Sequence, residues 1–128
     1  MKHMMNTEEN KIKKKLFHDG ILAFEKHEFY DAHEYWEELW SDYQLSDAKF
    51  IQGLIQLAVG YFHISNLNIN GARGLFTKCL PKLQEYSPKY RDIDIKNIIT
   101  YVEKTLDYLT VNQDLSKFDW SLVPNLKQ

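Results

Sequence analysis

A chain of 128 residues is long enough for one domain, which buries about two thirds of the surface that its unfolded form exposes. Its 16 lysines and arginines and its 18 aspartates and glutamates give a net charge of -2, which excludes a general electrostatic attraction to nucleic acid or to an anionic membrane. We therefore expect one hydrophobic core, no nucleic-acid partner, no membrane partner, and a local site for any other partner.

The cysteine content and the apolar runs predict a reduced, cytoplasmic setting. Cys79 is the single cysteine, so no internal disulfide is expected, and the first residues lack the apolar core of a signal peptide. The longest apolar stretch, FIQGLIQLAVGYFHI at 50–64, is too short to span a bilayer and contains two glutamines and a histidine. It is typical of a buried core helix.

The first predicted helix starts at Thr7, whose side chain suits an N-cap, and ends near Lys26. Apolar residues recur at helical spacing and place Ile12 and Leu16 toward the core. The lysines of KIKKK, residues 11–15, then belong to the solvated face of an amphipathic helix, and we expect no nucleic-acid site there.

A second helix is predicted from Asp31 to about Tyr43. Asp31 and Glu34 have the spacing of a capping box, in which two side chains satisfy backbone N–H groups at the helix start. The linker between the first two helices is very short, which favours antiparallel neighbours.

Two more helices follow, separated by the turn-forming segment NLNIN. Ser46 or Asp47 opens the third helix, which runs to about Ser65 and should be the most buried, because it is apolar almost all round. Asn70 is expected to cap the fourth helix. Pro81 removes one backbone hydrogen bond there, but apolar residues face inward on both sides of it, so we expect a kinked and continuous helix.

Asp94 is expected to cap a fifth helix that ends near Thr110. Residues 111–128 lack helical periodicity and are expected to dock on the bundle as an irregular tail. The apolar side chains that would dock it are Phe118, Trp120 and Val123. No segment has a strand pattern. The predicted fold is all-α, a single domain over 1–128 with a core at about 7–110, in which about five antiparallel helices form a bundle.

Two stripes of polar side chains mark the candidate site. One flank of the second helix carries His33, Glu37 and Trp40. The third helix carries its own polar stripe, formed by Gln52, Gln56 and His63. Because a buried polar group without a partner costs about 1–3 kcal/mol, we expect the two stripes to meet in one pocket, with at least one direct hydrogen bond between the helices.

The same residues leave two other interpretations open. Glu37 lies one turn after His33, where the two side chains can hydrogen-bond and act as a purely structural pair. HEYWE at 33–37 is also close to the zinc-protease pattern H-E-x-x-H, with Glu37 in place of the second histidine. His33, Glu37 and His63 would supply nitrogen and oxygen ligands for a divalent metal ion.

Three segments resemble a known family: FYDAHEYWEELW, FIQGLIQLAVGYFHI and NGARGLFTKCLPKL, followed by DID before the last long helix. From about Phe17 to Leu109, the chain resembles the small all-helical bacterial and archaeal proteins of domain of unknown function 309. The resemblance implies an all-helical single domain and no particular activity. It also implies a set of signature positions, which are His33, Glu34, Glu37, Trp40, Gln52, Gln56 and His63. Pro81 and the loop NLNIN depart from the pattern usual in that family.

Three functions are compatible with these residues. The first is a binding or interaction module, whose pocket between the second and third helices recognises a small ligand or a protein partner. The second is a metal-dependent hydrolase, in which His33, Glu37 and His63 hold a divalent ion and Glu34 or a bound water supplies the base. The third is a structural protein that acts as a homo-oligomer. We favour the first function because it requires least of the chain.

Overall fold

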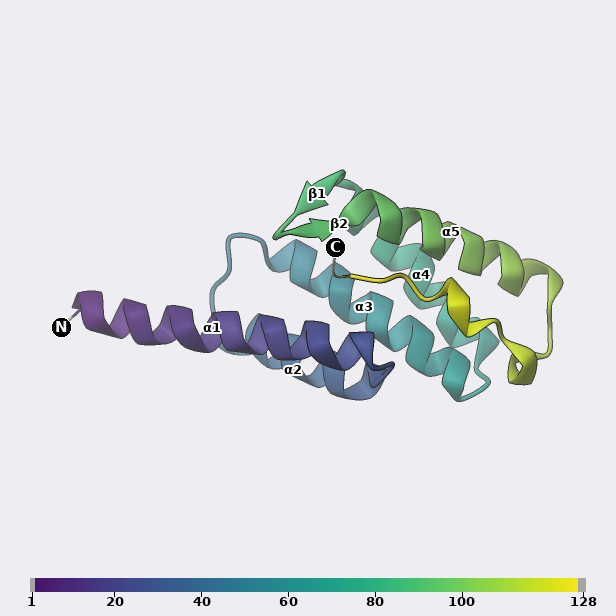
Figure 1. The fold of residues 1–128 in the computed structure, drawn as a ribbon, viewed down its shortest axis with the longest axis horizontal. Helices are drawn as coiled ribbons and strands as arrows, with labels where there is room; N and C mark the ends of the chain where they lie inside the picture. Colours follow the sequence, from purple (N-terminus) through teal and green to yellow (C-terminus); the bar gives the residue numbers. More distant parts are fainter. Residues whose placement is uncertain (1, 127–128) are drawn as a thin grey trace.

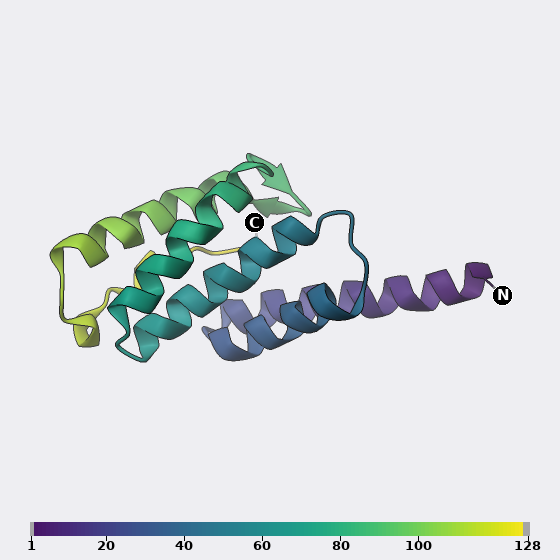
Figure 2. The same cartoon turned by 180° about the vertical axis from the view of Figure 1, so that it is seen from behind.

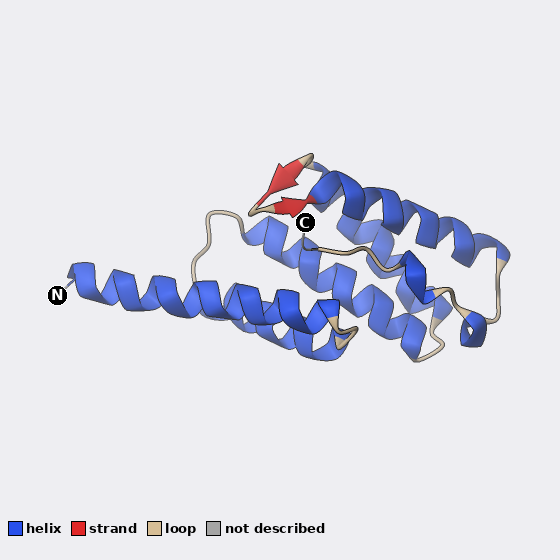
Figure 3. Ribbon diagram, viewed as in Figure 1, coloured by secondary structure: helices blue, strands red, loops and turns tan. Residues whose placement is uncertain are grey.

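The computed structural model describes residues 2–126, and the side chains of residues 7–126. Helices make up nearly all of the regular structure (Figures 1 and 3). The five α-helices are α1 (Lys2–Glu25), α2 (Phe29–Asp42), α3 (Ala48–Ser65), α4 (Ile69–Gln84) and α5 (Ile95–Val111). The short elements are β1 (Lys89–Tyr90), β2 (Ile93–Asp94), η1 (Leu115–Lys117) and η2 (Trp120–Leu122). The predicted all-α bundle is confirmed.

The helices form two layers. Figure 1 shows α1, α5 and the C-terminal tail in front, and Figure 2 shows α2, α3 and α4 from behind. The first turns of α1 project beyond the rest of the bundle. Half of the residues of α3 are buried, among them Phe50, Leu54, Leu57 and Tyr61, so the prediction that this helix lies in the core is confirmed. Within residues 2–126, none of the helices combines the length and apolar character needed to cross a bilayer.

The ends of α1 and α3 share a backbone motif. His27 and Leu67 adopt left-handed backbone angles, each with φ of 60°, just after α1 and α3. At the first end, His27 N–H donates to Phe24 O and Glu28 N–H donates to Ala23 O, both at 2.9 Å. This is the Schellman pattern, which usually has glycine at the left-handed position. Without a glycine there, the sequence does not mark the left-handed residue itself.

The starts of three helices differ from the predictions. α1 begins at Lys2, ahead of Thr7, because no residue between them interrupts the helix. α2 begins at Phe29, ahead of Asp31, where the burial of the Phe29 ring against Phe24 fixes the first turn. α4 is capped by Asn68, whose side chain accepts a hydrogen bond from Gly71 N–H, and not by Asn70.

Other boundary predictions are confirmed. Asp94 caps α5 by accepting a hydrogen bond from Asn97 N–H at 2.9 Å. α3 ends at Ser65, and α4 continues unbroken past Pro81 to Gln84. Leu16 is buried, whereas Ile12 is exposed and its expected position in the core is wrong, because this part of α1 has passed the edge of the bundle.

A small hairpin corrects the expectation that the chain has no strands. β1 and β2 pair antiparallel, with Lys89 opposite Asp94 and Tyr90 opposite Ile93. The two residues between them, Arg91 and Asp92, both have positive φ, which is the backbone twist that a two-residue hairpin turn requires. The hairpin is too short to add a layer to the helical bundle.

A buried carboxylate holds this hairpin against the α2–α3 loop. Asp47 is 5% exposed and accepts hydrogen bonds from Arg91 Nε at 2.8 Å, Arg91 Nη2 at 3.2 Å and the Tyr90 hydroxyl at 3.1 Å. The Arg91 guanidinium also lies over the Phe17 ring, 4.6 Å from its centroid. Asp47 precedes α3 as predicted, but its side chain joins the loop to the hairpin instead of capping the helix.

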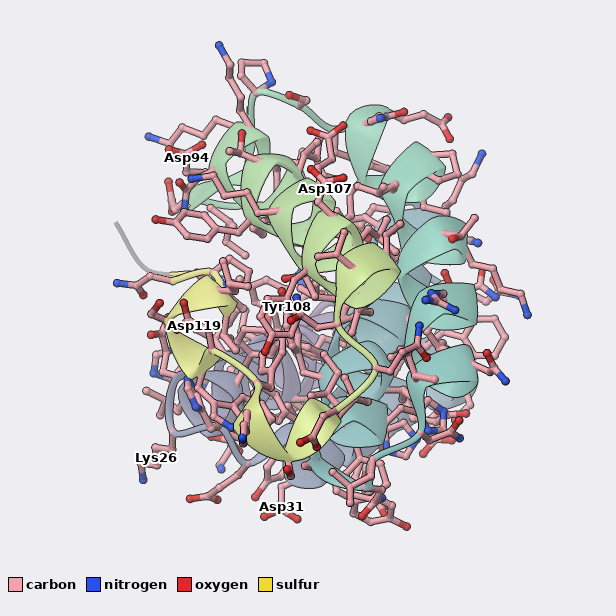
Figure 4. All side chains as sticks on the ribbon, turned by 90° about the vertical axis from the view of Figure 1, so that its right-hand side faces the viewer. Lys26, Asp31, Asp94, Asp107, Tyr108 and Asp119 are labelled. Atoms are coloured by element: carbon pink, nitrogen blue, oxygen red, sulfur yellow. The ribbon has the colours of Figure 1, made fainter. Side chains whose placement is uncertain are left out.

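The C-terminal tail docks as predicted. It runs between α1 and α5 (Figure 1), and in the end-on view its residue Asp119 lies between Lys26 and Asp94 (Figure 4). Phe118 is buried, and the Trp120 ring stacks against another aromatic ring. Leu126 N–H donates to Glu25 Oε1 at 3.0 Å, which fastens the tail to the end of α1.

Two glycines test how closely α3 and α4 are packed. A Cβ atom added at Gly60 on α3 would lie 2.5 Å from the Phe76 ring, whereas one added at Gly74 on α4 would meet nothing within 4 Å. Gly60→Ala is therefore expected to lower the free energy of unfolding by about 1–3 kcal/mol through overpacking. Gly74→Ala is expected to raise it by about 1 kcal/mol through helix propensity. Urea unfolding of both variants checks this, and equal effects would contradict the packing described.

The Asp47 junction gives a second stability prediction. Asp47→Asn places an amide N–H group against the Arg91 and Tyr90 donors, so we expect the free energy of unfolding to fall by about 2 kcal/mol. The matched control is Glu85→Gln, which removes the same charge from an exposed ion pair with Lys49 and should cost less than about 1 kcal/mol. Thermal unfolding followed by circular dichroism measures both, and an equal loss in the two variants would rule against the junction as a major contribution.

Candidate functional site

The second helix divides into a buried stripe and an open flank, as the helical wheel predicts. Ala32, Trp36 and Leu39 are fully buried, together with Phe29 at the head of the stripe. The predicted site residues lie on the flank: the side chain of His33 is 23% exposed, that of Glu37 is 50% exposed, and Trp40 is exposed. The expected burial of Glu37 is therefore wrong, because α2 lies at the edge of the bundle and only one of its faces is covered.

His33 is held by two acceptors on its own helix. Its Nδ1 lies 3.2 Å from the Tyr30 carbonyl oxygen, and its Nε2 lies 3.2 Å from Glu37 Oε2. The predicted contact between His33 and Glu37 is thus confirmed. A neutral imidazole has one N–H and serves one of these acceptors, whereas the imidazolium serves both.

The third helix presents a half-buried stripe next to this flank. Its polar members are Gln52, Gln56 and His63, and its apolar members are Ile55, Val59 and Phe62. His63 Nδ1 lies 3.3 Å from the Asn68 amide nitrogen. Since the Asn68 oxygen caps α4, its NH2 group is the donor, and His63 accepts at Nδ1. In the neutral ring this leaves the His63 Nε2–H as a donor.

The expected hydrogen bond between the two stripes is not formed. Among the side chains of residues 7–126, none from His33, Glu37 or Trp40 bonds to the polar side chains of the α3 stripe. The reason is that both histidines find partners close by in sequence, and partial exposure removes the need for a partner across the interface. Gln56 is the exception, because its Oε1 is buried and has no hydrogen-bond partner in the described part of the chain.

The two histidines nevertheless border one hollow. It has a volume of about 130 Å³ and lies between the first turns of α2 and the last turns of α3. Its lining residues are Tyr30, His33, Val59, Phe62 and His63. Of the six predicted site residues, only His33 and His63 line it. Glu37 is linked to it through His33, while Trp40, Gln52 and Gln56 lie on the same stripes further from it.

Sequence reasoning missed the apolar part of this hollow. Tyr30 precedes His33 by one turn, and Val59 and Phe62 lie between Gln56 and His63 on the same side of α3. Helical spacing alone would have found these residues. They were passed over because apolar side chains on a core helix are ordinarily assigned to the core.

The outward face of α2 is strongly acidic. The helix contains no lysine or arginine. Its acidic residues are all exposed, and they are Asp31, Glu34, Glu37, Glu38 and Asp42. A hydrogen bond to Glu34 and the charge of Glu34 raise the pKa of the Tyr30 phenol. Glu34 also lines a separate, acidic hollow with Asp31 and Glu38, so it does not face His33 and His63 as a catalytic base would.

The arrangement does not supply a metal centre. Among the described residues, no group of three or more His, Cys, Asp and Glu side chains is placed so that it could hold a metal ion. His33, Glu37 and His63, predicted as alternative ligands, therefore do not form a ligand set here.

Cys79 is not a nucleophile in this fold. It is fully buried on α4, and its thiol donates to Phe76 O at 3.4 Å. Burial raises the pKa of the thiol to about 12, so the thiolate is a minor species at neutral pH.

Comparison with known proteins agrees with the resemblance in the sequence. Residues 17–75 match the family described as Domain of unknown function (DUF309), a range that contains all of α2 and α3 and therefore the whole hollow. No curated protein sequence matches the chain. The match ends at residue 75 within α4, so it does not include Pro81 or the DID segment. Over residues 17–75, this chain is therefore similar to the DUF309 family.

Proposed function

We propose that this protein is a binding module that holds one apolar side chain of a protein partner in the hollow between α2 and α3. The observation that carries the proposal is the hollow itself, which brings Tyr30, His33, Phe62 and His63 together from two helices. All of its lining residues belong to α2 and α3, two helices that Figure 2 shows from behind.

The size of the hollow favours a protein partner over a small ligand. Sites for small molecules commonly have volumes of about 300–1,000 Å³, and the hollow has about 130 Å³. A space of this size suits a single apolar side chain, anchored as in the central pockets of protein interfaces.

The surroundings of the hollow support the same type of partner. Tyr30 borders the hollow and Trp40 lies further along the same flank, and both side chains are exposed. Exposed tyrosine and tryptophan are enriched where protein partners bind. Because the flank belongs to the acidic helix α2, we propose a partner segment that carries lysine or arginine beside its apolar anchor.

Two polar groups would orient the partner segment. Gln56, one turn before Val59 on α3, has a buried Oε1 without a donor among the described residues, and its amide would turn outward to accept a backbone N–H of the partner. His63, whose Nδ1 is occupied by Asn68, offers its Nε2–H to a partner carbonyl. One acceptor and one donor on the same stripe are what an extended peptide backbone requires.

Filling the hollow is expected to abolish binding. We would select peptides from a random display library on the wild-type protein, and then measure the affinity of the synthetic consensus peptide by isothermal titration calorimetry. Val59→Phe should weaken binding at least about tenfold, because the added ring occupies the anchor position. Val111→Phe is the matched control, since Val111 is 78% exposed at the end of α5, and it should bind like the wild type. Peptides that bind all three proteins equally, or that share no apolar residue, would contradict the proposal.

Gln56→Leu separates a binding role from a structural role. Removal of a buried acceptor that has no partner should leave the free energy of unfolding unchanged or raise it by up to about 1 kcal/mol. The same variant should lose affinity for the selected peptide, because the backbone N–H of the partner would then lack its acceptor. Urea unfolding and calorimetry on one preparation give both values. A loss of stability without a loss of affinity would assign the amide to the fold alone.

A further inference from the structure

A second and larger cavity lies at the opposite end of α2. Its volume is about 740 Å³, and it is bounded by α1, by the 43–47 loop between α2 and α3, and by the hairpin turn. We call it the loop groove; its lining residues are Asn10, Lys13, Lys14, Phe17, Gln44, Leu45, Ser46, Asp47, Arg91 and Asp92. The hollow between α2 and α3 starts at the first turns of α2, whereas the groove follows its last residue. The 14 residues of α2 span about 20 Å, and this length separates the two cavities.

One face of α1 forms a wall of the groove with two lysines that have no acidic partner among the described side chains. Lys13 and Lys14 line the groove, and no ion pair joins either of them to a described side chain. The neighbouring lysines on the same helix behave differently, because Lys11 lies 3.9 Å from Glu8 and Lys15 lies 2.7 Å from Asp19. Lys13 is also half-buried, a position in which the alkyl stem of a lysine covers the protein surface while its ammonium group stays accessible.

The opposite wall adds a fixed guanidinium. Arg91 uses Nε and Nη2 to hold Asp47, and its plane is fixed over the Phe17 ring. Nη1 and the second Nη2 hydrogen are not used in these bonds and remain as donors. The charged groups of the lining are three cations and two carboxylates. One of the carboxylates, Asp47, is already paired with Arg91, and the other, Asp92, lies at the hairpin turn.

The remaining polar lining consists of neutral groups. Asn10, Gln44 and Ser46 contribute amide and hydroxyl donors between the two charged walls. Phe17 and Leu45 supply an apolar surface beside them. The cavity volume falls within the range common for small-molecule sites, unlike that of the hollow between α2 and α3.

We propose that the loop groove binds a small organic anion, whose phosphate or carboxylate groups are held by Lys13, Lys14 and Arg91. The unpaired lysines supply charge, and the Asp47-anchored Arg91 supplies a donor in a fixed orientation, as in other sites for oxyanions. The organic part of the ligand lies against Phe17 and Leu45. This site is independent of the proposed partner-binding hollow, so either proposal can fail without the other.

The test measures binding of two simple anions to the full chain by isothermal titration calorimetry at low salt. Pyrophosphate serves as the phosphate probe and citrate as the carboxylate probe. The groove variant is the double substitution Lys13→Gln and Lys14→Gln. The matched control is the double substitution Lys11→Gln and Lys15→Gln, which removes the same charge from the same helix but outside the groove.

We expect at least one probe to bind the wild type, with affinity reduced at least about tenfold in the groove variant and within about twofold of wild type in the control. The probe that binds more tightly identifies the acid group of the natural ligand. Absence of binding by both probes would overturn the proposal. An equal loss of affinity in the two double variants would also overturn it, because the probe would then be attracted to the overall charge of α1 and not to the groove.

Discussion

The burial of α3 between the other helices is the constraint on which the rest of the structure depends. This helix is apolar on nearly every side, so other helices must cover it from both sides. The helix α4 approaches it closely where Gly60 lies under the Phe76 ring. One stripe of α3 remains half-buried beside α2. Gln52, Gln56 and His63 lie on that stripe, and the hollow with His33 and His63 forms at its end.

A second junction organises the opposite end of the bundle. Asp47 is buried and draws Arg91 and Tyr90 toward it, and through the contact of Arg91 with Phe17 it also ties the hairpin to α1. A buried carboxylate is tolerated only with such partners, because its desolvation would otherwise be costly. The same junction fixes the turn at Arg91 and Asp92 and thereby shapes the loop groove. One buried ion pair thus supports both the packing of the irregular segments and a cavity between them.

The two cavities differ in the chemistry they offer. The hollow between α2 and α3 is small, lined by aromatic, imidazole and aliphatic groups, and flanked by an acidic helix. The loop groove is several times larger and is lined by lysine, arginine and amide groups. A segment of a protein and a small anion would therefore not compete for the same place. The chain has a net charge of -2, yet its charges are separated, with carboxylates gathered on α2 and unpaired lysines on α1.

The sequence by itself determined the helical class, the central place of α3, the Asp94 cap and the docking of the tail, because apolar periodicity and a local capping residue are properties of short segments. It also indicated the contact of His33 with Glu37, which are one turn apart. Only the tertiary structure decided the rest. The sequence placed the ends of α1 and α3 but not the left-handed backbone of His27 and Leu67, because neither residue is a glycine. Whether the flank of α2 is covered depends on which helices lie next to it, and the pairing of Asp47 with Arg91 joins residues 44 positions apart. Such contacts depend on the arrangement of whole helices, which no local pattern encodes.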